Sequence, residues 1–110
     1  MDERAKRVGL NEAVFREANE RIGELAQTFA LTEHPLDLVC ECGDATCTQQ
    51  VRMTYAEYER VRDDPRLFAI YPGHEAPDVE DVVERQDDFD IVRKHEGDPA
   101  RLAKHTDPRS

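Results

Sequence analysis

All three cysteines of the chain lie within eight residues, in the segment CECGDATC from Cys40 to Cys47. The spacing is C-x-C-x4-C, and thiolates held this close together bind zinc or iron well. No apolar run approaches the roughly 18 residues that span a membrane, and the opening MDERAKRVGL lacks the apolar region of a secretory signal. We therefore expect a cytoplasmic protein whose cysteines stay reduced and ligate a metal ion.

A closed tetrahedral site needs a fourth ligand, which is usually Cys or His. The chain has no further cysteine and four histidines: His34, His74, His95 and His105. His34 precedes Cys40 by six residues across an expected strand, which would place it some 20 Å from the cluster. His74 lies in the turn Y-P-G-H at the end of an apolar strand that can meet the cysteine loop.

The sequence therefore predicts one metal site with four ligands: Cys40, Cys42, Cys47 and His74. Other donors remain open for the fourth position, namely His34, Glu41, Asp44 or a water molecule. The favoured ion is a single zinc, and an iron–sulfur cluster is the alternative.

Composition favours one small domain over residues 1–110, with residues 1–8 and 106–110 frayed. Apolar residues make up 38% of the 110 residues and charged residues 36%, so the core is lean and a metal would help to stabilise it. The formal net charge of −10 repels phosphate groups and argues against direct contact with nucleic acid.

The N-terminal half predicts a helix followed by a hairpin. Apolar residues recur at helical spacing and form one stripe that we expect to face the core: Leu10, Val14, Ala18, Ile22, Leu25 and Phe29. Asn11 is the expected N-cap, and the charged residues between 16 and 24, Arg16 among them, form a solvated face. Residues 36–42 and 49–54 are expected strands, and the turn-rich residues 43–46 join them into a hairpin with the cysteines at its tip.

The C-terminal half predicts short elements. Thr54 and Glu57 form a capping-box pattern that begins a helix ending near Arg62, and residues 67–71 form a buried strand. Residues 79–85 and 89–95 are expected to pair as a hairpin, with a helix over 78–86 as the alternative. A last short helix begins with Asp98 as N-cap and Pro99 at its first position.

Together these segments predict an α+β fold. It consists of a long N-terminal helix, a small antiparallel sheet with a metal-binding hairpin, and one or two short helices.

The chain also resembles a family of small bacterial proteins that have no assigned activity. The likeness covers Gly9 to Arg109 and rests on GLNEAVFREANERI, LDLVCECGDATC, a T-x-x-E-Y-E helix, PGH and IVRKHEGDPARLAKHTDPR. The resemblance implies that the cysteine cluster and the PGH turn form one site. A weaker likeness is to iron–sulfur proteins of the CDGSH type, but here Thr48 and Gln49 follow the third cysteine in place of Asp-Gly-x-His.

The leading functional hypothesis is a small zinc-stabilised module that binds a protein partner and has a regulatory role. A redox- or metal-sensing protein is one alternative, because metal-bound thiolates can be oxidised. A zinc enzyme is another, in which water occupies an open position and Glu41 or His34 acts as base. No other catalytic motif accompanies the cluster: G-x-S-x-G, the P-loop and H-E-x-x-H are all missing from the sequence.

Overall fold

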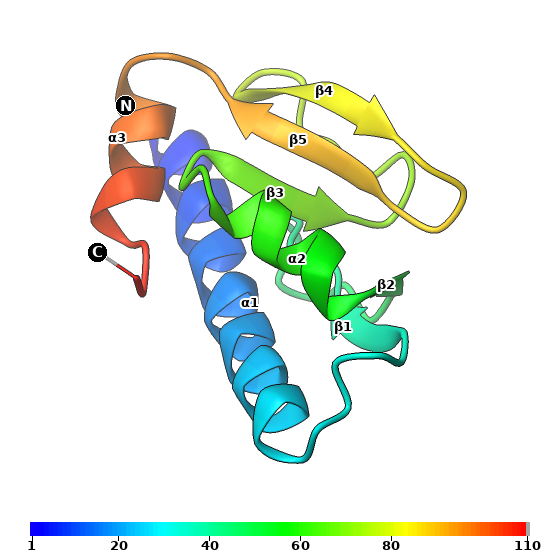
Figure 1. Cartoon of the computed structure of the whole chain (residues 1–110). Coiled ribbons are helices and arrows are strands. Elements are labelled where there is room, and N and C mark those ends of the chain that lie inside the picture. The colour runs from blue at the N-terminus through cyan, green and yellow to red at the C-terminus, as the bar shows by residue number, and fades with distance from the viewer. Residues whose placement is uncertain (110) are drawn as a thin grey trace.

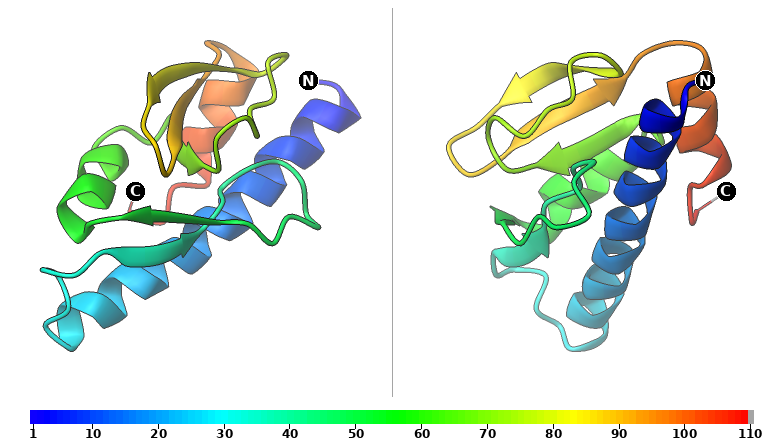
Figure 2. Two further views of the ribbon diagram at one scale, coloured as in Figure 1. Left: turned by 90° about the vertical axis from the view of Figure 1, so that its right-hand side faces the viewer. Right: turned by 180° about the vertical axis from the view of Figure 1, so that it is seen from behind.

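The computed structural model describes residues 1–109 and has the predicted α+β architecture (Figure 1). The elements in chain order are α1 (Glu3–Thr28), β1 (Leu36–Val39), β2 (Gln50–Met53), α2 (Tyr55–Arg62), β3 (Leu67–Ile70), β4 (Glu80–Arg85), β5 (Asp90–Lys94) and α3 (Asp98–His105). The helix α1 runs past both sheets. The hairpin β1–β2 lies along it, while the three-stranded sheet and α3 lie towards its N-terminal end (Figures 1 and 2).

The strands form two antiparallel sheets, whereas we expected one. The first is the hairpin β1–β2, and the second has the strand order β3-β5-β4. The two sheets meet where β1 ends, through the bond from the Glu41 N–H to the Ala69 carbonyl (2.8 Å). Hydrogen bonding between this segment and β3 does not continue as a strand pairing, because the chain turns into the cysteine loop after Glu41.

The hairpin predicted for the C-terminal half is confirmed, since β4 and β5 pair in antiparallel register. The helical alternative over residues 78–86 is therefore wrong. A register shift between Val82 and Glu84 bends β4 and leaves Val83 43% exposed.

Two predicted helix starts have different outcomes. The capping box of α2 is confirmed, because the Thr54 side chain accepts from the Glu57 N–H while the Glu57 carboxylate accepts from the Thr54 N–H. For α3 the expected N-cap was off by one residue. Gly97 occupies that position with φ +97°, a conformation that glycine adopts without strain, and Asp98 is the first helical residue.

The predicted start of α1 is wrong. The helix begins at Glu3, because the Asp2 carboxylate accepts from the Ala5 N–H and caps the helix two turns before Asn11. Most of the segment 1–8 that we expected to fray is thus helical. Asn11 instead donates from its side chain to the Gly43 carbonyl (2.9 Å), which ties the cysteine loop to α1.

Residues 106–109 are also held more firmly than we expected, and Ser110, the last residue of the segment expected to fray, lies outside the described residues. Thr106 caps α3 by donating to the Leu102 carbonyl. The Arg109 guanidinium makes two hydrogen bonds to the Glu59 carboxylate and one to that of Glu20. These contacts fix residues 106–109 against α1 and α2.

The face of α1 that packs inward is not the apolar stripe. Val14 and Phe29 are each 66% exposed and Leu25 is 57% exposed, and of the stripe only Ile22 packs against the core. The buried residues lie on another face: Val8, Gly9, Glu12, Arg16, Asn19, Gly23 and Ala26. Small residues on this face allow close approach; a Cβ at Gly9 would lie 2.5 Å from the Leu102 side chain.

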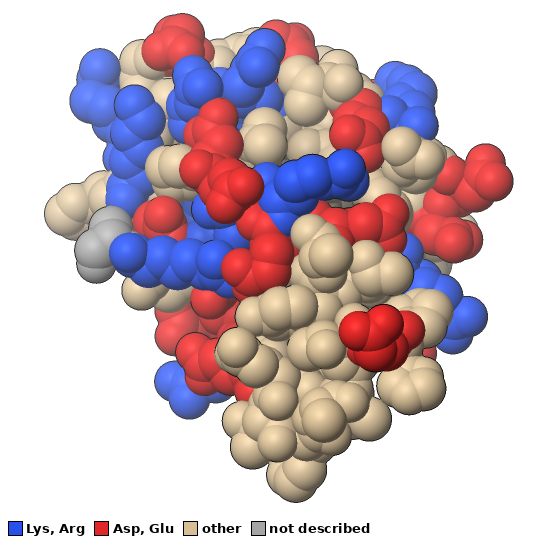
Figure 3. Space-filling model, viewed as in Figure 1, with Lys and Arg blue, Asp and Glu red and all other residues tan. Residues whose placement is uncertain are grey.

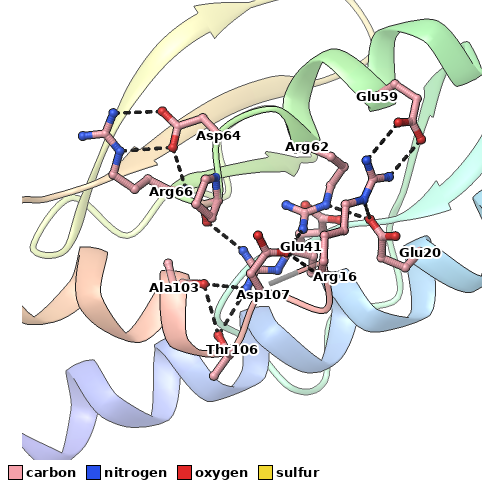
Figure 4. Close-up of polar contacts among 12 residues, drawn as sticks. Arg16, Glu20, Glu41, Glu59, Arg62, Asp64, Arg66, Ala103, Thr106 and Asp107 are labelled. Atoms are coloured by element: carbon pink, nitrogen blue, oxygen red, sulfur yellow. Dashed lines mark hydrogen bonds and ion pairs between the residues drawn. The ribbon is translucent and has the colours of Figure 1, made fainter.

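Arg16, which we expected on a solvated face, is fully buried. Its guanidinium donates to the Pro65 carbonyl (2.8 Å). It also donates to the Ala103 carbonyl (2.8 Å) and to the Thr106 hydroxyl (3.2 Å), as Figure 4 shows. It also lies 4.6 Å from the centre of the Phe68 ring, a cation–π arrangement. Buried charges persist only where such partners are supplied, and Arg16 here binds α1 to α3 and to the connection between α2 and β3.

A second buried polar group joins α1 to the larger sheet. The Lys94 ammonium lies between the carboxylates of Glu12 (2.6 Å) and Glu80 (3.0 Å), and all three side chains are almost completely buried. Two carboxylates share one cation. Burial raises the pKa of Glu12 well above its usual range, and the neighbouring Glu80 raises it further against the opposing effect of Lys94.

The apolar interior forms two adjoining clusters. The larger joins α1, α2 and both sheets around Leu38, Val51 and Tyr58. The smaller surrounds the buried cysteines and includes Phe68, Ile70, Val92 and Ala103. Within residues 1–109, no helix has the length and apolar character needed to cross a membrane.

Candidate metal centre

The hairpin β1–β2 delivers the three cysteines. Its strands pair from Leu36 opposite Met53 to Val39 opposite Gln50, and the Cys40 N–H donates to the Gln49 carbonyl just beyond them (3.1 Å). The connecting loop is shaped by Asp44, whose carboxylate accepts from both the backbone and the hydroxyl of Thr46. This closed turn returns the chain so that Cys47 faces Cys40 and Cys42.

The fourth side chain comes from a turn that follows β3. The His74 N–H donates to the Tyr71 carbonyl (3.0 Å), and Gly73 takes the left-handed conformation that this turn requires, with φ +89°. The rings of Tyr71 and His74 pack against each other with 5.1 Å between centroids. The Glu41–Ala69 bond places β3 beside the hairpin, so its exit turn meets the cysteine loop, as the sequence predicted.

The four predicted ligands come together as one group: the ligand atoms of Cys40, Cys42, Cys47 and His74 all lie within 4.8 Å of one another. His74 Nδ1 lies 3.7 Å from the Cys40 sulfur and 3.6 Å from that of Cys47. Zinc–sulfur and zinc–nitrogen bonds of about 2.3 and 2.0 Å at a tetrahedral angle separate sulfur from nitrogen by roughly 3.5 Å. The donor set therefore has the chemistry of a tetrahedral site, and the two sulfur–nitrogen distances at His74 have its spacing.

Backbone groups support the sulfurs. The Tyr71 N–H donates to the Cys40 sulfur (3.0 Å), which favours a thiolate there and orients it. Cys40 and Cys42 are each only 2% exposed, whereas Cys47 is half-buried. The cluster is thus shielded on the core side and approachable through Cys47.

Without a metal the thiols share protons unequally. A hydrogen bond from Cys40 lowers the pKa of Cys42 to about 5, and the same bond, together with burial, raises the pKa of Cys40 above its usual range. Burial also raises the pKa of Cys47. Binding a metal must therefore displace the protons of Cys40 and Cys47.

Glu41 lies between the first two cysteines but belongs to the interior. One of its oxygens accepts from the side chains of Asn19 and Tyr58 (both 2.8 Å), and the other accepts from the Ala69 N–H (2.9 Å). Burial raises its pKa, and these hydrogen bonds oppose the shift. Asn19 also bonds both the N–H and the carbonyl of Val39, so one side chain of α1 fixes the end of β1.

The cysteine loop packs against the N-terminal half of α1. A Cβ at Gly43 would lie 2.5 Å from Val8, so the backbone comes close to the helix at this point. Beside this contact, Cys42, Gly43, His74 and Pro77 help to line an open pocket of about 350 Å³. One side of the cluster therefore faces solvent.

The remaining candidate ligands lie outside the group of four. Glu41 is engaged in the interior, and Asp44 holds the loop turn. His95 pairs with Asp81 at 3.2 Å, and His105 ends α3. Among residues 1–109, the group of four is the one set of His, Cys, Asp and Glu with metal-binding spacing.

Sequence reasoning missed the supports of the site, Asn19 and Tyr58, and treated Glu41 as a possible ligand or base. A weak signal exists for Glu41. In a strand its side chain points opposite to those of Cys40 and Cys42, and hence into the core when both cysteines face the ion.

Compared with known proteins, the chain matches no family model, no curated protein and no solved structure. The resemblance to a family of small bacterial proteins stays a prediction, and the chain is characterised by its Cys3His group, which could hold a metal ion.

Proposed function

We propose that this protein is a small module stabilised by one zinc ion bound to Cys40, Cys42, Cys47 and His74. The observation that carries the proposal is the spacing of the donors, since the sulfur–nitrogen distances of 3.6 and 3.7 Å match a tetrahedral zinc site. Three thiolates with one imidazole are typical ligands of structural zinc.

A structural role is supported by where the ligands come from. Three belong to the β1–β2 hairpin and the fourth to the turn after β3, so the ion would join the two sheets beside the backbone bond from Glu41, just beyond β1, to Ala69 of β3. Apparent zinc-binding free energies of about 10–16 kcal/mol in small zinc modules are as large as the stability of a whole domain. A chain with 38% apolar residues benefits from such a contribution.

The enzyme alternative receives little support from the site. Four protein donors fill the tetrahedral positions and leave none for water. Glu41, one of the two bases considered for it, has both carboxylate oxygens bonded inside the fold. The protein partner inferred from the acidic composition stays a prediction.

One observation favours the sensing alternative as a second candidate. Cys42 and His74 line an open pocket, so a small oxidant can reach the cluster. If the metal is sensory, mild peroxide should release zinc in step with loss of the hairpin, and zinc that stays bound after peroxide treatment would exclude this role.

The main proposal is tested by elemental analysis and absorption spectroscopy of the purified protein, followed by melting with and without a chelator. We expect a colourless protein with one zinc per chain that loses much of its thermal stability on chelation. Iron in the elemental analysis together with visible absorption would indicate an iron–sulfur cluster instead of zinc. A metal-free protein whose melting temperature changes neither with added zinc nor with chelator would refute the proposal.

A further inference from the structure

The outward face of α1 carries exposed apolar side chains that belong to neither of the two core clusters. Leu10 is 43% exposed, Val14 and Phe29 are 66% exposed, and Leu25 is 57% exposed. Exposed Ala18 lies on the same face between them. Single exposed apolar residues are ordinary, but an aligned set on one helix face indicates an interaction surface.

The charge of α1 permits close approach of a similar surface. The helix contains five acidic and five basic residues, so its formal charge is zero, although the whole chain carries −10. In Figure 3 the part of the surface where α1 ends and the chain turns towards β1 is mostly free of charged side chains. Electrostatic repulsion between two copies is therefore weak at this helix.

The positions of the exposed residues are symmetric about the middle of the helix. Leu10 and Phe29 lie equally far from the midpoint between residues 19 and 20, and so do Val14 and Leu25. Ala18 and Arg21 form the innermost pair in the same way. In an antiparallel two-fold arrangement, each residue of a pair therefore faces the other residue in the second copy.

We propose that two copies of the chain associate antiparallel through this face of α1, which we call the α1 stripe: Leu10, Val14, Ala18, Arg21, Leu25 and Phe29. The seam would be about 28 Å long at the rise of an α-helix. It brings Phe29 of the second copy to Leu10. An open groove lies there and can receive an aromatic ring; its lining is Leu10, Ala13, Val14, Glu17 and Thr106.

The centre of the seam sets its orientation. Ala18 is small and leaves room for the Arg21 side chain of the second copy, which then lies beside Glu17. Within one chain Arg21 and Glu17 are 3.8 Å apart and both are well exposed, so they are free to exchange partners across the seam. By symmetry this ion pair forms twice, and it favours antiparallel over parallel packing.

The test is sedimentation or light scattering of the purified full chain over a wide range of micromolar concentrations. We expect a reversible dimer. The variants Val14→Glu and Leu25→Lys should each weaken it about 100-fold or more, because each variant places two charges in an apolar seam. Both positions are exposed in the single chain, so thermal melting should show that the variants fold. Val83→Glu, the same change at an exposed valine on β4, is the matched control and should leave the dimer intact.

An equal mixture of Val14→Glu and Leu25→Lys is the decisive sample. In the antiparallel register, the carboxylate at position 14 of one chain faces the ammonium at position 25 of the other, so the mixture should form heterodimers. A wild type that stays monomeric at every concentration would overturn the proposal. So would variants that dimerise like the wild type, or a mixture that remains monomeric.

Discussion

Replacing His74 by asparagine removes one of the four donors and tests the metal site directly. Asparagine keeps a polar side chain in the turn but leaves three sulfurs to hold the ion. The turn itself should persist, because its backbone bond to the Tyr71 carbonyl and the conformation of Gly73 do not involve the imidazole.

Two contributions of His74 differ greatly in size. Its contact with the Tyr71 ring is half-exposed, and a pair of this kind contributes about 1 kcal/mol. If the lost ligand weakens zinc binding about 1,000-fold, the unfolding free energy at fixed zinc falls by about 4 kcal/mol. For a domain of this size, that loss lowers the melting temperature by about 15 °C or more.

The assay is thermal melting of four samples: wild type and His74→Asn, each with excess zinc and with chelator. We expect the melting temperatures of wild type and His74→Asn to differ greatly with zinc. With chelator they should differ only slightly, by the amount that corresponds to the packing of His74 on Tyr71. His34→Asn is the matched control, because His34 is exposed and lies outside the cluster. Equal melting of wild type and His74→Asn in zinc, or a gap that persists in chelator, would refute the reasoning.

Further outcomes test the interior and the protons of the site. For Glu12→Gln, the folded wild type holds the carboxyl proton to higher pH than the unfolded chain does. The unfolding free energy of the wild type should therefore fall relative to that of the variant as the pH rises above about 4.5. Denaturant titrations at several pH values measure both; a difference between wild type and variant that does not change with pH would contradict this. Asn19→Ala removes a donor to buried Glu41 and should cost about 2 kcal/mol or more in denaturant unfolding, so a loss near zero would argue against the network. Zinc affinity in competition titrations should fall with decreasing pH, because Cys40 and Cys47 hold their protons tightly; a flat profile would mean that they are not ligands.

Local signals in the sequence were enough for most of the elements and for the gathering of the four side chains. The capping box of Thr54 and Glu57 acts within one turn, so the sequence shows it directly. The meeting of His74 with the cysteines followed from one assumption, that the strand before the turn lies beside the hairpin, and the Glu41–Ala69 bond fulfils it.

The orientation of α1 could not be predicted in this way. Apolar periodicity pointed to the stripe containing Val14 and Phe29, but the helix packs through Glu12, Arg16 and Asn19. These side chains are stable inside because of distant partners, such as the Ala103 carbonyl and the Lys94 ammonium. Periodicity shows where apolar residue types recur and carries no information about hydrogen-bond partners some 80 residues away.

The tripeptide Cys40-Glu41-Cys42 has a consequence for how this centre could be gained or lost. Its middle side chain secures the strand to three other elements, while its flanking side chains belong to the group that could hold a metal ion. Preorganisation of the thiols is thus controlled from the opposite side of the backbone, so a chain with all four donors intact would still hold metal poorly once that central carboxylate is replaced. Substitutions remote from the ion, in the lining that receives the carboxylate, are therefore an independent route by which affinity can be tuned.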